Sequence, residues 1–380
     1  MTTTTSETTV DSPTDSPTDA ATDAATDAAT DAAAAFTGRV LGDTAAAATV
    51  VLAALGDRLG LFASLTADGP ATSDELAART STDERYVRGW AAGLVAAGYL
   101  ERDLVDGRIV LPAAHVPTLA QEAGPTFFGG VHQELVGGIQ RYHGVADAFH
   151  TGGGVALEDL HEDVWIGTER FTAGWHRNLL VQQWLPLMPD VQDGLRAGAR
   201  VADVGCGAGR GAVALAKAFP ACTVVGYDAH APVVERARAL AVEAGVADRV
   251  SFAVLDAADG LPERFDMITT FDVLHDAVDP QRLLTAIHDA LAPGGVHVCL
   301  EINCADRAED NLGPIATLLY GFSLLYCMTT SLAHGGAGLG TLGLPAARLR
   351  ELAARAGFAR VRHVEMDNPF NSLYELWRAA

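Results

Sequence analysis

The residues best suited to chemistry form a glycine turn that is preceded by an acid. Asp203 opens the spacing D-x-G-x-G-x-G, which continues through Gly205, Gly207 and Gly209. Glycine tolerates positive φ and lets the backbone approach a ligand closely. The turn lies between a short apolar run and an alanine- and valine-rich stretch, which predicts a buried parallel strand leading into a helix. The free N–H groups of that helix then point at whatever binds there.

Acids are also expected at the ends of the next two strands. Asp228 ends the apolar run TVVGYD, and Asp256, followed by Ala257, ends VSFAVLD. Phe271 ends the strand after these. Because ligands of doubly wound sheets bind beyond the carboxyl ends of the strands, we expect these residues to surround one crevice with the glycine turn.

Two cofactors are compatible with the turn. Gly207, Gly209 and Ala212 satisfy the G-x-G-x-x-G/A fingerprint of dinucleotide sites, so an NAD(P)-dependent oxidoreductase is an alternative. The acid Asp203 and the triple-glycine spacing instead resemble the first motif of class I S-adenosylmethionine-dependent methyltransferases. That resemblance implies S-adenosyl-L-methionine as the cofactor, with Asp228 at the ribose hydroxyls and Asp256 and Ala257 at the adenine.

The segment FDVLHDAVDP holds the candidate catalytic residues His275 and Asp276. It resembles the VLHDW-type segment of plant and bacterial small-molecule O-methyltransferases, in which the histidine takes the substrate proton. An imidazole titrates near neutral pH and can do this work. Ala277 replaces the tryptophan of that motif, which leaves methylation of carbon open beside methylation of oxygen. Glu301 ends the fifth strand beside the same crevice and is the third catalytic candidate.

A metal is not predicted. His275 with Glu301, or His230 with His297, could approach a cation, but their spacing matches no ligand motif. The cysteines form no C-x-x-C pair, which favours a reducing, cytoplasmic compartment; they are Cys206, Cys222, Cys299, Cys304 and Cys327.

Acceptor-binding residues are expected in two segments. Residues 121–190 are the most aromatic part of the chain, and in the resembled family this helical linker covers the substrate pocket. Phe171, Trp175 and His176 are the candidates there. The second segment is an insertion over residues 305–344, half apolar helix and half glycine-rich loop. Tyr326 and Met328 are its candidates.

The carboxyl-terminal part, residues 191–380, predicts an α/β fold. Strands and helices alternate from Gly198 onward, which indicates a doubly wound, mostly parallel, Rossmann-like sheet of seven strands. The last two strands, VRHVEM and SLYELWR, are close in sequence and are expected to form an antiparallel edge.

The amino-terminal part predicts a mainly α winged-helix domain over residues 37–120. An amphipathic helix over Ala45–Leu65 is followed by a helix capped at Thr72 or Ser73, a helix capped at Ser81 or Thr82, and a hairpin turning at Asp106-Gly107. It resembles the dimerisation domain of the small-molecule O-methyltransferases, which implies a homodimer. Residues 1–36 are an acidic low-complexity tail with a four-residue repeat, for which we predict disorder.

Composition limits the partners. The 380 residues carry a formal net charge of −22, which argues against nucleic-acid binding and thus against the other reading of a winged helix, a ligand-sensing transcriptional regulator. No apolar run is expected to cross a membrane. Taken with the resemblance, the sequence predicts an S-adenosylmethionine-dependent methyltransferase that acts on a small, aromatic or apolar acceptor in specialised metabolism.

Overall fold

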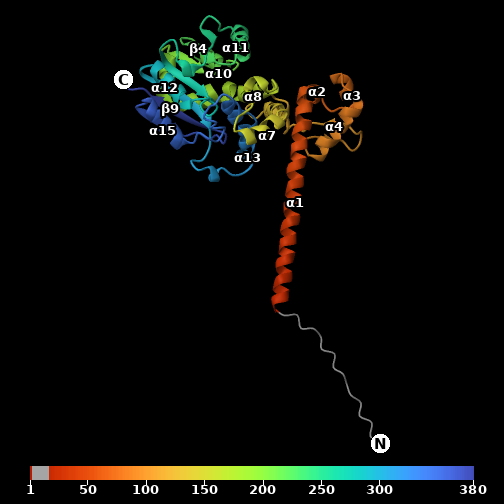
Figure 1. Cartoon of the computed structure of the whole chain (residues 1–380). Coiled ribbons are helices and arrows are strands. Elements are labelled where there is room, and N and C mark those ends of the chain that lie inside the picture. Colours follow the sequence, from red (N-terminus) through yellow and green to blue (C-terminus); the bar gives the residue numbers. More distant parts are fainter. Residues whose placement is uncertain (2–16) are drawn as a thin grey trace. The chain divides into compact units, whose positions relative to one another are not determined.

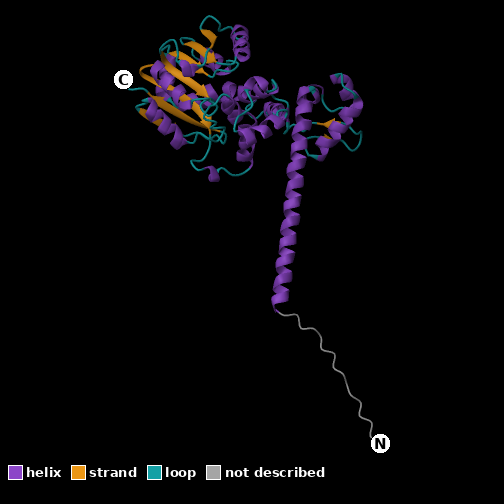
Figure 2. Cartoon of the chain, viewed as in Figure 1, coloured by secondary structure: helices purple, strands orange, loops and turns teal. Residues whose placement is uncertain are grey.

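The computed structural model describes residue 1 and residues 17–380, with side chains from residue 26 onward in the second range. Its contacts divide the chain into two units, residues 1–52 and residues 53–380. Figure 1 shows the elements in chain order and Figure 2 their type. The second unit contains the sheet and the helices that position the candidate site.

The sheet has seven strands in the order β5-β4-β3-β6-β7-β9-β8. Strands β3 to β7 pair in parallel, whereas β9 runs antiparallel to both β7 and β8. This confirms the predicted doubly wound sheet with an antiparallel edge. The strands are β3 (Arg200–Val204), β4 (Thr223–Asp228), β5 (Val250–Val254), β6 (Phe265–Phe271), β7 (Leu291–Ile302), β8 (Arg360–Val364) and β9 (Asn371–Trp377).

Helices cover both faces of the sheet. Alternate side chains of a strand point to opposite faces, and Val201 and Ala202 of β3 accordingly belong to different apolar cores. The first core includes residues of α9, α10 and α11, and the second includes residues of α12 and α15. These helices are α9 (Pro189–Arg196), α10 (Arg210–Ala218), α11 (Ala231–Glu243), α12 (Pro280–Ala290) and α15 (Ala346–Ala356).

The first helix, α1 (Pro17–Arg58), bears on two expectations. Residues 17–36 are helical, so the prediction of disorder is wrong there; residues 2–16 of the predicted tail lie outside the described residues. Alanine is the strongest helix former, and its propensity outweighs repulsion of a few tenths of a kcal/mol between acids four residues apart. The predicted domain boundary near residue 37 falls inside α1, and the predicted domain limits stay predictions.

The winged-helix domain forms as predicted, with local differences. The expected helix over Ala45–Leu65 is interrupted at Gly60, whose φ of 70° does not fit an α-helix. Thr72 and Glu75 form a capping box at the start of α3, as predicted for Thr72. Asp83, rather than Ser81 or Thr82, caps α4 by accepting a hydrogen bond from the Arg85 N–H. The elements are α2 (Leu61–Asp68), α3 (Ser73–Thr80), α4 (Glu84–Ala96), β1 (Glu101–Arg102) and β2 (Ile109–Val110).

A helical linker joins this domain to the sheet. Within it, α6 and α8 touch through glycines: a Cβ atom added to Gly167 would lie 2.5 Å from the Glu134 nitrogen and 2.7 Å from the Gly130 oxygen. The two backbones therefore approach more closely than larger residues would allow. The linker elements are α5 (Val116–Leu119), α6 (Gly129–Ile139), α7 (Tyr142–Thr151), the 3₁₀ turns Leu157–Asp159 and Leu185–Leu187, α8 (Asp163–Trp175), and a π-helix (His176–Trp184).

The insertion after β7 is largely helical. Its elements are the 3₁₀ turn Ala308–Asp310, α13 (Pro314–Phe322), a π-helical segment (Ser323–Cys327) and α14 (Met328–Ala333). The helical stretches Pro314–Ala333 and Thr26–Arg58 are long and apolar enough to cross a membrane by length and composition alone, a test that core helices of soluble proteins also pass. Within Pro314–Ala333, Ala316, Leu319 and Phe322 are buried in the protein.

The glycine contact between α6 and α8 leads to a prediction. Gly167→Ala places a methyl group against the α6 backbone, and overpacking of this kind costs about 1–3 kcal/mol of unfolding free energy. Chemical denaturation measures this loss. Gly194→Ala in α9 is the control, since an added Cβ there meets nothing within 4 Å. Equal stability of the two variants would contradict the close approach.

Candidate functional site

A cavity of about 310 Å³ lies at the carboxyl ends of the central strands. Its walls come from the loops after β3, β4 and β6, from α6 and α8, and from the insertion. Of the predicted site residues, the cavity is lined by Asp203, Gly205, Gly207, Asp228, Phe271, His275, Asp276, Phe171, Trp175, His176 and Tyr326. The fold therefore brings together most residues that the strand-end rule had placed around one crevice.

Five predicted site residues do not line this cavity. Asp256 is exposed and accepts a hydrogen bond from the Ala258 N–H at 2.9 Å, and Ala257 is buried in the second core. A Cβ atom on Gly209 would lie 2.6 Å from the Phe252 ring, so this glycine serves close packing where α10 begins. Met328 also lies outside the cavity lining, and Glu301 lies behind His275. The proposed adenine contacts of Asp256 and Ala257 stay predictions.

The glycine turn is held by the acid of the next strand. The Gly207 N–H donates to Asp228 Oδ2 at 2.9 Å, and the His230 N–H donates to Oδ1 at 2.8 Å. Gly207 has φ of 51°, and a Cβ atom there would meet no atom within 4 Å. Burial raises the pKa of Asp228, although both N–H donors oppose that shift. The backbone at Gly207 is therefore accessible from the cavity, next to the Asp228 carboxyl group that two hydrogen bonds hold in place.

Asp203 lies at the end of β3 beneath this turn. Its side chain is buried and accepts a hydrogen bond from the Thr269 hydroxyl at 2.7 Å. Burial raises its pKa to about 7, against the lowering effects of Thr269 and the Ala212 N–H. A Cβ atom on Gly211 would lie 3.3 Å from Asp203 Oδ2 and 2.9 Å from the Phe271 ring. The start of α10 therefore sits directly against this acid.

His275 and Glu301 form a buried pair. His275 Nδ1 lies 2.7 Å from Glu301 Oε2, while Glu301 Oε1 accepts the N–H groups of Leu274 at 2.6 Å and Val273 at 3.2 Å. Asp276 Oδ1 lies 3.0 Å from His275 Nε2, an ion-pair distance whose angles do not make a hydrogen bond. Burial lowers the pKa of His275, but Asp276 and Glu301 together raise it well above its usual value of 6.5.

Many other residues that line the cavity were missed by the sequence analysis, and three of them are described here. Glu134 of α6 is buried, and burial raises its pKa to about 8. Asp272, with φ of 57°, accepts from Asn371 Nδ2 at 2.8 Å, and burial raises its pKa to about 8. Phe370 packs against Phe171 with ring centroids 6.0 Å apart. Asp272 follows Phe271 directly and could have been chosen; Glu134 and Phe370 carry no local signal.

The possible metal arrangements differ from those considered above. His297 bonds to Thr270 Oγ1 at 2.9 Å inside the sheet and does not line the cavity, so the fold does not direct it toward His230. Donor atoms of His275, Asp276 and Cys327 lie within 4.8 Å of one another. Glu301 already binds the imidazole of that set, and we assign no metal there.

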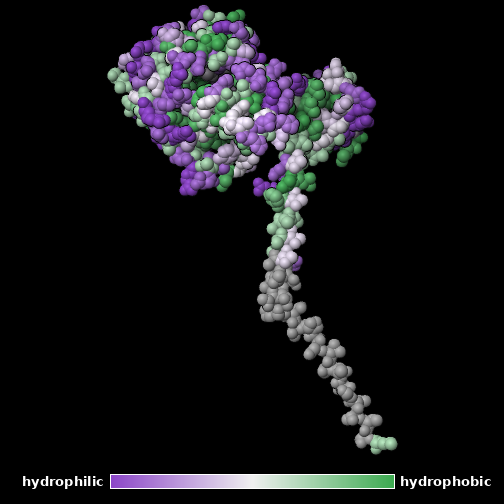
Figure 3. All heavy atoms as spheres, in the orientation of Figure 1, coloured by the Kyte–Doolittle hydropathy of each residue, from purple (hydrophilic) through white to green (hydrophobic). Residues whose placement is uncertain are grey.

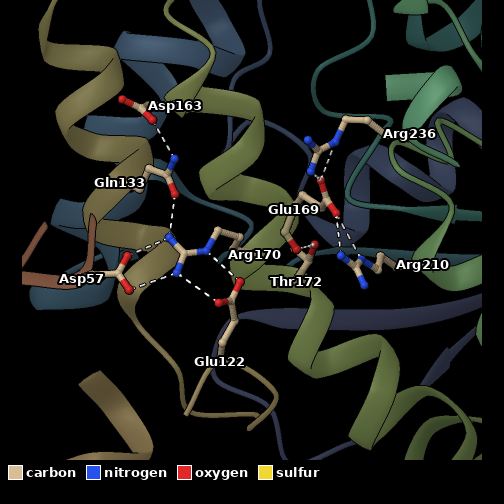
Figure 4. A network of polar contacts seen from close by, with 9 residues as sticks. All are labelled: Asp57, Glu122, Gln133, Asp163, Glu169, Arg170, Thr172, Arg210 and Arg236. Atoms are coloured by element: carbon tan, nitrogen blue, oxygen red, sulfur yellow. Dashed lines mark hydrogen bonds and ion pairs between the residues drawn. The ribbon is translucent and has the colours of Figure 1, made fainter. Parts of the chain in front are cut away.

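Two neighbouring residues of α8 make ion pairs in different directions (Figure 4). Arg170 binds Asp57 at the end of α1 and Glu122 of the linker, and its Nη1 donates to Gln133 of α6. Glu169 instead binds Arg210 of α10 and Arg236 of α11. Helix α8 therefore connects residues beside the winged helix to the helix that follows the glycine turn.

Comparison with known proteins adds family evidence to this geometry. Residues 195–318 match the family model described as a methyltransferase domain, and residues 46–121 match a winged helix-turn-helix domain of the Rv2258c-like type. The chain carries a winged helix-turn-helix domain and a methyltransferase domain. Neither match favours the oxidoreductase alternative.

A curated relative matches part of the chain. The ubiquinone biosynthesis O-methyltransferase of Ruegeria pomeroyi is 34% identical over 107 residues, which are 28% of this chain and 42% of that protein. The chain spans less than half the length of the first curated relatives that it matches.

Solved structures share the fold over most of the chain. Human N-acetylserotonin methyltransferase in complex with S-adenosylmethionine has a TM-score of 0.67 at 21% identity, covering 90% of this chain and 98% of that one. An O-methyltransferase of neocarzinostatin biosynthesis, in complex with S-adenosyl-L-homocysteine and 1,4-dihydroxy-2-naphthoic acid, has a TM-score of 0.58 at 22% identity, covering 90% and 98%. The predicted methyltransferase fold with an amino-terminal winged helix is confirmed.

Proposed function

We propose that this protein transfers a methyl group from S-adenosyl-L-methionine to a small aromatic acceptor. One observation carries the proposal: the glycine turn, bonded to Asp228, opens onto the same cavity as the buried His275. The methyltransferase domain and the small-molecule methyltransferases that share the fold support this reading. The volume of the cavity, about 310 Å³, lies at the lower end of the range usual for small-molecule sites.

The residues of the cavity fit this cofactor. Asp228 can accept hydrogen bonds from two vicinal ribose hydroxyls, and Asp203 can face an ammonium group. The bare backbone at Gly207 leaves room for a ligand against the turn. S-Adenosyl-L-methionine supplies an electrophilic methyl group on a sulfonium when it is bound.

The chain contributes alignment and proton transfer. Holding the acceptor in line with the methyl group and excluding water can provide roughly 7–11 kcal/mol of the rate enhancement. Glu301 accepts from His275 Nδ1–H and so fixes the imidazole, which leaves Nε2 as the atom that can take a proton from a hydroxyl or an enol. Oxygen is the favoured acceptor atom, and an acidic carbon position is served by the same base.

Aromatic side chains define the acceptor class. Phe171 and Trp175 meet with ring centroids 4.5 Å apart, and Phe370 closes the group at 6.0 Å from both rings. All three line the cavity. Stacked or edge-on contacts with a flat ring are worth about 0.5–1.5 kcal/mol each beyond area burial. The neocarzinostatin enzyme is in complex with 1,4-dihydroxy-2-naphthoic acid, which agrees with an aromatic hydroxyl compound of specialised metabolism as the acceptor proposed here.

The cysteines support a cytoplasmic location. All five are free thiols in the described part of the chain, and four of them are buried. Reduced cysteines are the rule in the cytoplasm.

A homodimer is proposed from the surface of α1 (Figure 3). Leu41, Thr44, Ala48, Val51 and Leu55 are exposed and follow the three- and four-residue spacing of a helix-pairing seam. The apolar stretch Trp90–Leu100 offers no second pairing surface, because Trp90, Leu94 and Leu100 are buried inside the winged-helix domain.

The dimer leads to a prediction. Light scattering of the full chain should report twice the chain mass, and the double variant Leu41→Glu/Leu55→Glu should be a monomer, because charges at the seam oppose pairing. Leu104→Glu is the control, since that side chain is 97% exposed on the wing. A parent chain that is monomeric at micromolar concentration would refute the dimer.

Cofactor binding tests the proposed function directly. Gly207→Val adds a β-branched side chain at a positive φ and fills the space above the turn, and Asp228→Ala removes the carboxyl group. Calorimetric titration with S-adenosyl-L-methionine should show at least about tenfold weaker binding for each variant, because one charge-assisted contact is worth about 1.5–3 kcal/mol. Unchanged affinity in both would remove the cofactor assignment.

The base is tested by pH. Because the pKa of His275 is raised, the imidazole is protonated at low pH and becomes a base only as pH rises through a midpoint above 6.5. The parent's single-turnover rate should rise across that midpoint, and Glu301→Gln should shift it to lower pH by removing a negative charge. His275→Ala should lower kcat by about 10²–10⁴ with cofactor affinity retained.

A different acceptor would give a different result. For an intrinsically nucleophilic carbon or amine, alignment supplies most of the rate, and His275→Ala should lose less than about tenfold. A variant with the parental rate and the parental pH profile would leave His275 a structural role only.

A further inference from the structure

One cationic side chain that lines the cavity, Arg210, has no role in the function proposed above. Among the described residues that line it, Arg210 is the only arginine and there is no lysine, against six carboxyl side chains. His176 also lines the cavity, but burial lowers its pKa to about 4, so it is neutral at physiological pH. Arg210 and His176 line the same cavity, so the guanidinium lies at its wall.

The guanidinium is held at one edge only. Arg210 Nε and Nη2 donate to Glu169 Oε1 at 3.2 and 2.8 Å, and Arg236 takes the other carboxylate oxygen (Figure 4). In the described part of the chain Nη1 makes no hydrogen bond. Glu169 with its two arginines keeps a net positive charge of one. An arginine presents five N–H donors in a rigid fork, so a second carboxylate can bind at the free edge.

The position of Arg210 indicates which carboxylate binds at the free edge of its guanidinium. Arg210 begins α10 directly after the glycine turn, and the next residue, Gly211, lies against Asp203. Asp203 is the acid suited to the cofactor's ammonium. In an amino acid the ammonium and the carboxylate are attached to the same carbon, so the carboxylate must lie beside Asp203 too. The free N–H groups at the start of α10 add partial positive charge there.

We propose that Arg210 binds the carboxylate of the methionine end of S-adenosyl-L-methionine, with Glu169 fixing the opposite edge of the guanidinium. This inference rests on the proposed function, since it assumes that cofactor. It assigns Arg210 as a binding residue and Glu169 as a positioning residue. Helix α8, which carries Glu169, then helps to shape the cofactor end of the cavity.

The test compares S-adenosyl-L-methionine with its decarboxylated analogue, which differs only by the carboxylate. Calorimetry on the full chain should show that the parent binds the complete cofactor roughly 10- to 100-fold more tightly, as expected for a charge-assisted contact. Arg210→Gln should abolish that preference while binding the analogue like the parent. Arg210→Lys, which keeps the charge but not the fork, should retain part of the preference.

Arg236→Gln is the matched control. It breaks the other half of the same ion-pair cluster, but Arg236 does not line the cavity, so the preference should persist. A persistent preference in Arg210→Gln, or equal binding of both ligands by the parent, would overturn the assignment while leaving the proposed function intact. No binding of either ligand by the parent would instead reject the proposed function. If Arg210→Gln does not fold by circular dichroism, the Arg210→Lys and parent titrations decide.

Discussion

The contacts of the Glu301 carboxylate hold His275 and the loop after β6 in place at the cavity. One oxygen accepts two backbone N–H groups from the loop after β6, and the other lies on the His275 imidazole. Such a buried carboxylate is costly unless its lone pairs are satisfied. Here three donors satisfy it, so one side chain at the end of β7 joins two parallel strands and orients the histidine, whose pKa it raises together with Asp276. The loop that carries His275 has no other acid bonded to its backbone in this way among the described residues.

The glycine turn is also held by an acid at the end of a neighbouring parallel strand. Asp228 at the end of β4 accepts the Gly207 N–H of the turn after β3, so the acid of one strand shapes the loop of its neighbour. Both sites depend on parallel strands ending at one edge, where short side chains reach the adjacent loop. Helix α8 then closes this edge from outside: Glu169 binds α10 while Arg170 binds the segments next to the winged helix. The amino-terminal domain thus has a structural connection to the cofactor end of the cavity.

Local sequence predicted what depends on local geometry. The turn from Asp203 to Gly209, the strand that precedes it and the helix cap at Thr72 follow from spacing within a few residues, and each is present. Glu134 and Phe370 reach the cavity only because α6 and the start of β9 pack there, which no short pattern encodes. Asp256 follows β5, which ends at Val254, and its side chain caps the next 3₁₀ turn, a local contact that the strand-end rule does not include. The helix of residues 17–36 was missed because polarity was weighed above alanine content.

The raised pKa values of the cavity acids explain how several carboxyl groups can be buried close together. Several ionised carboxyl groups in one buried space would repel one another and lose hydration, at a cost of several kcal/mol per charge. Burial instead raises the pKa of Glu134 and Asp272 to about 8 and that of Asp203 to about 7, so these groups hold protons near neutral pH. The cavity is therefore less negative near neutral pH than its six carboxyl side chains suggest. A cationic ligand such as a sulfonium that also carries an ammonium would favour the ionised forms, which makes the same acids compatible with a stable fold and with the cofactor proposed for it.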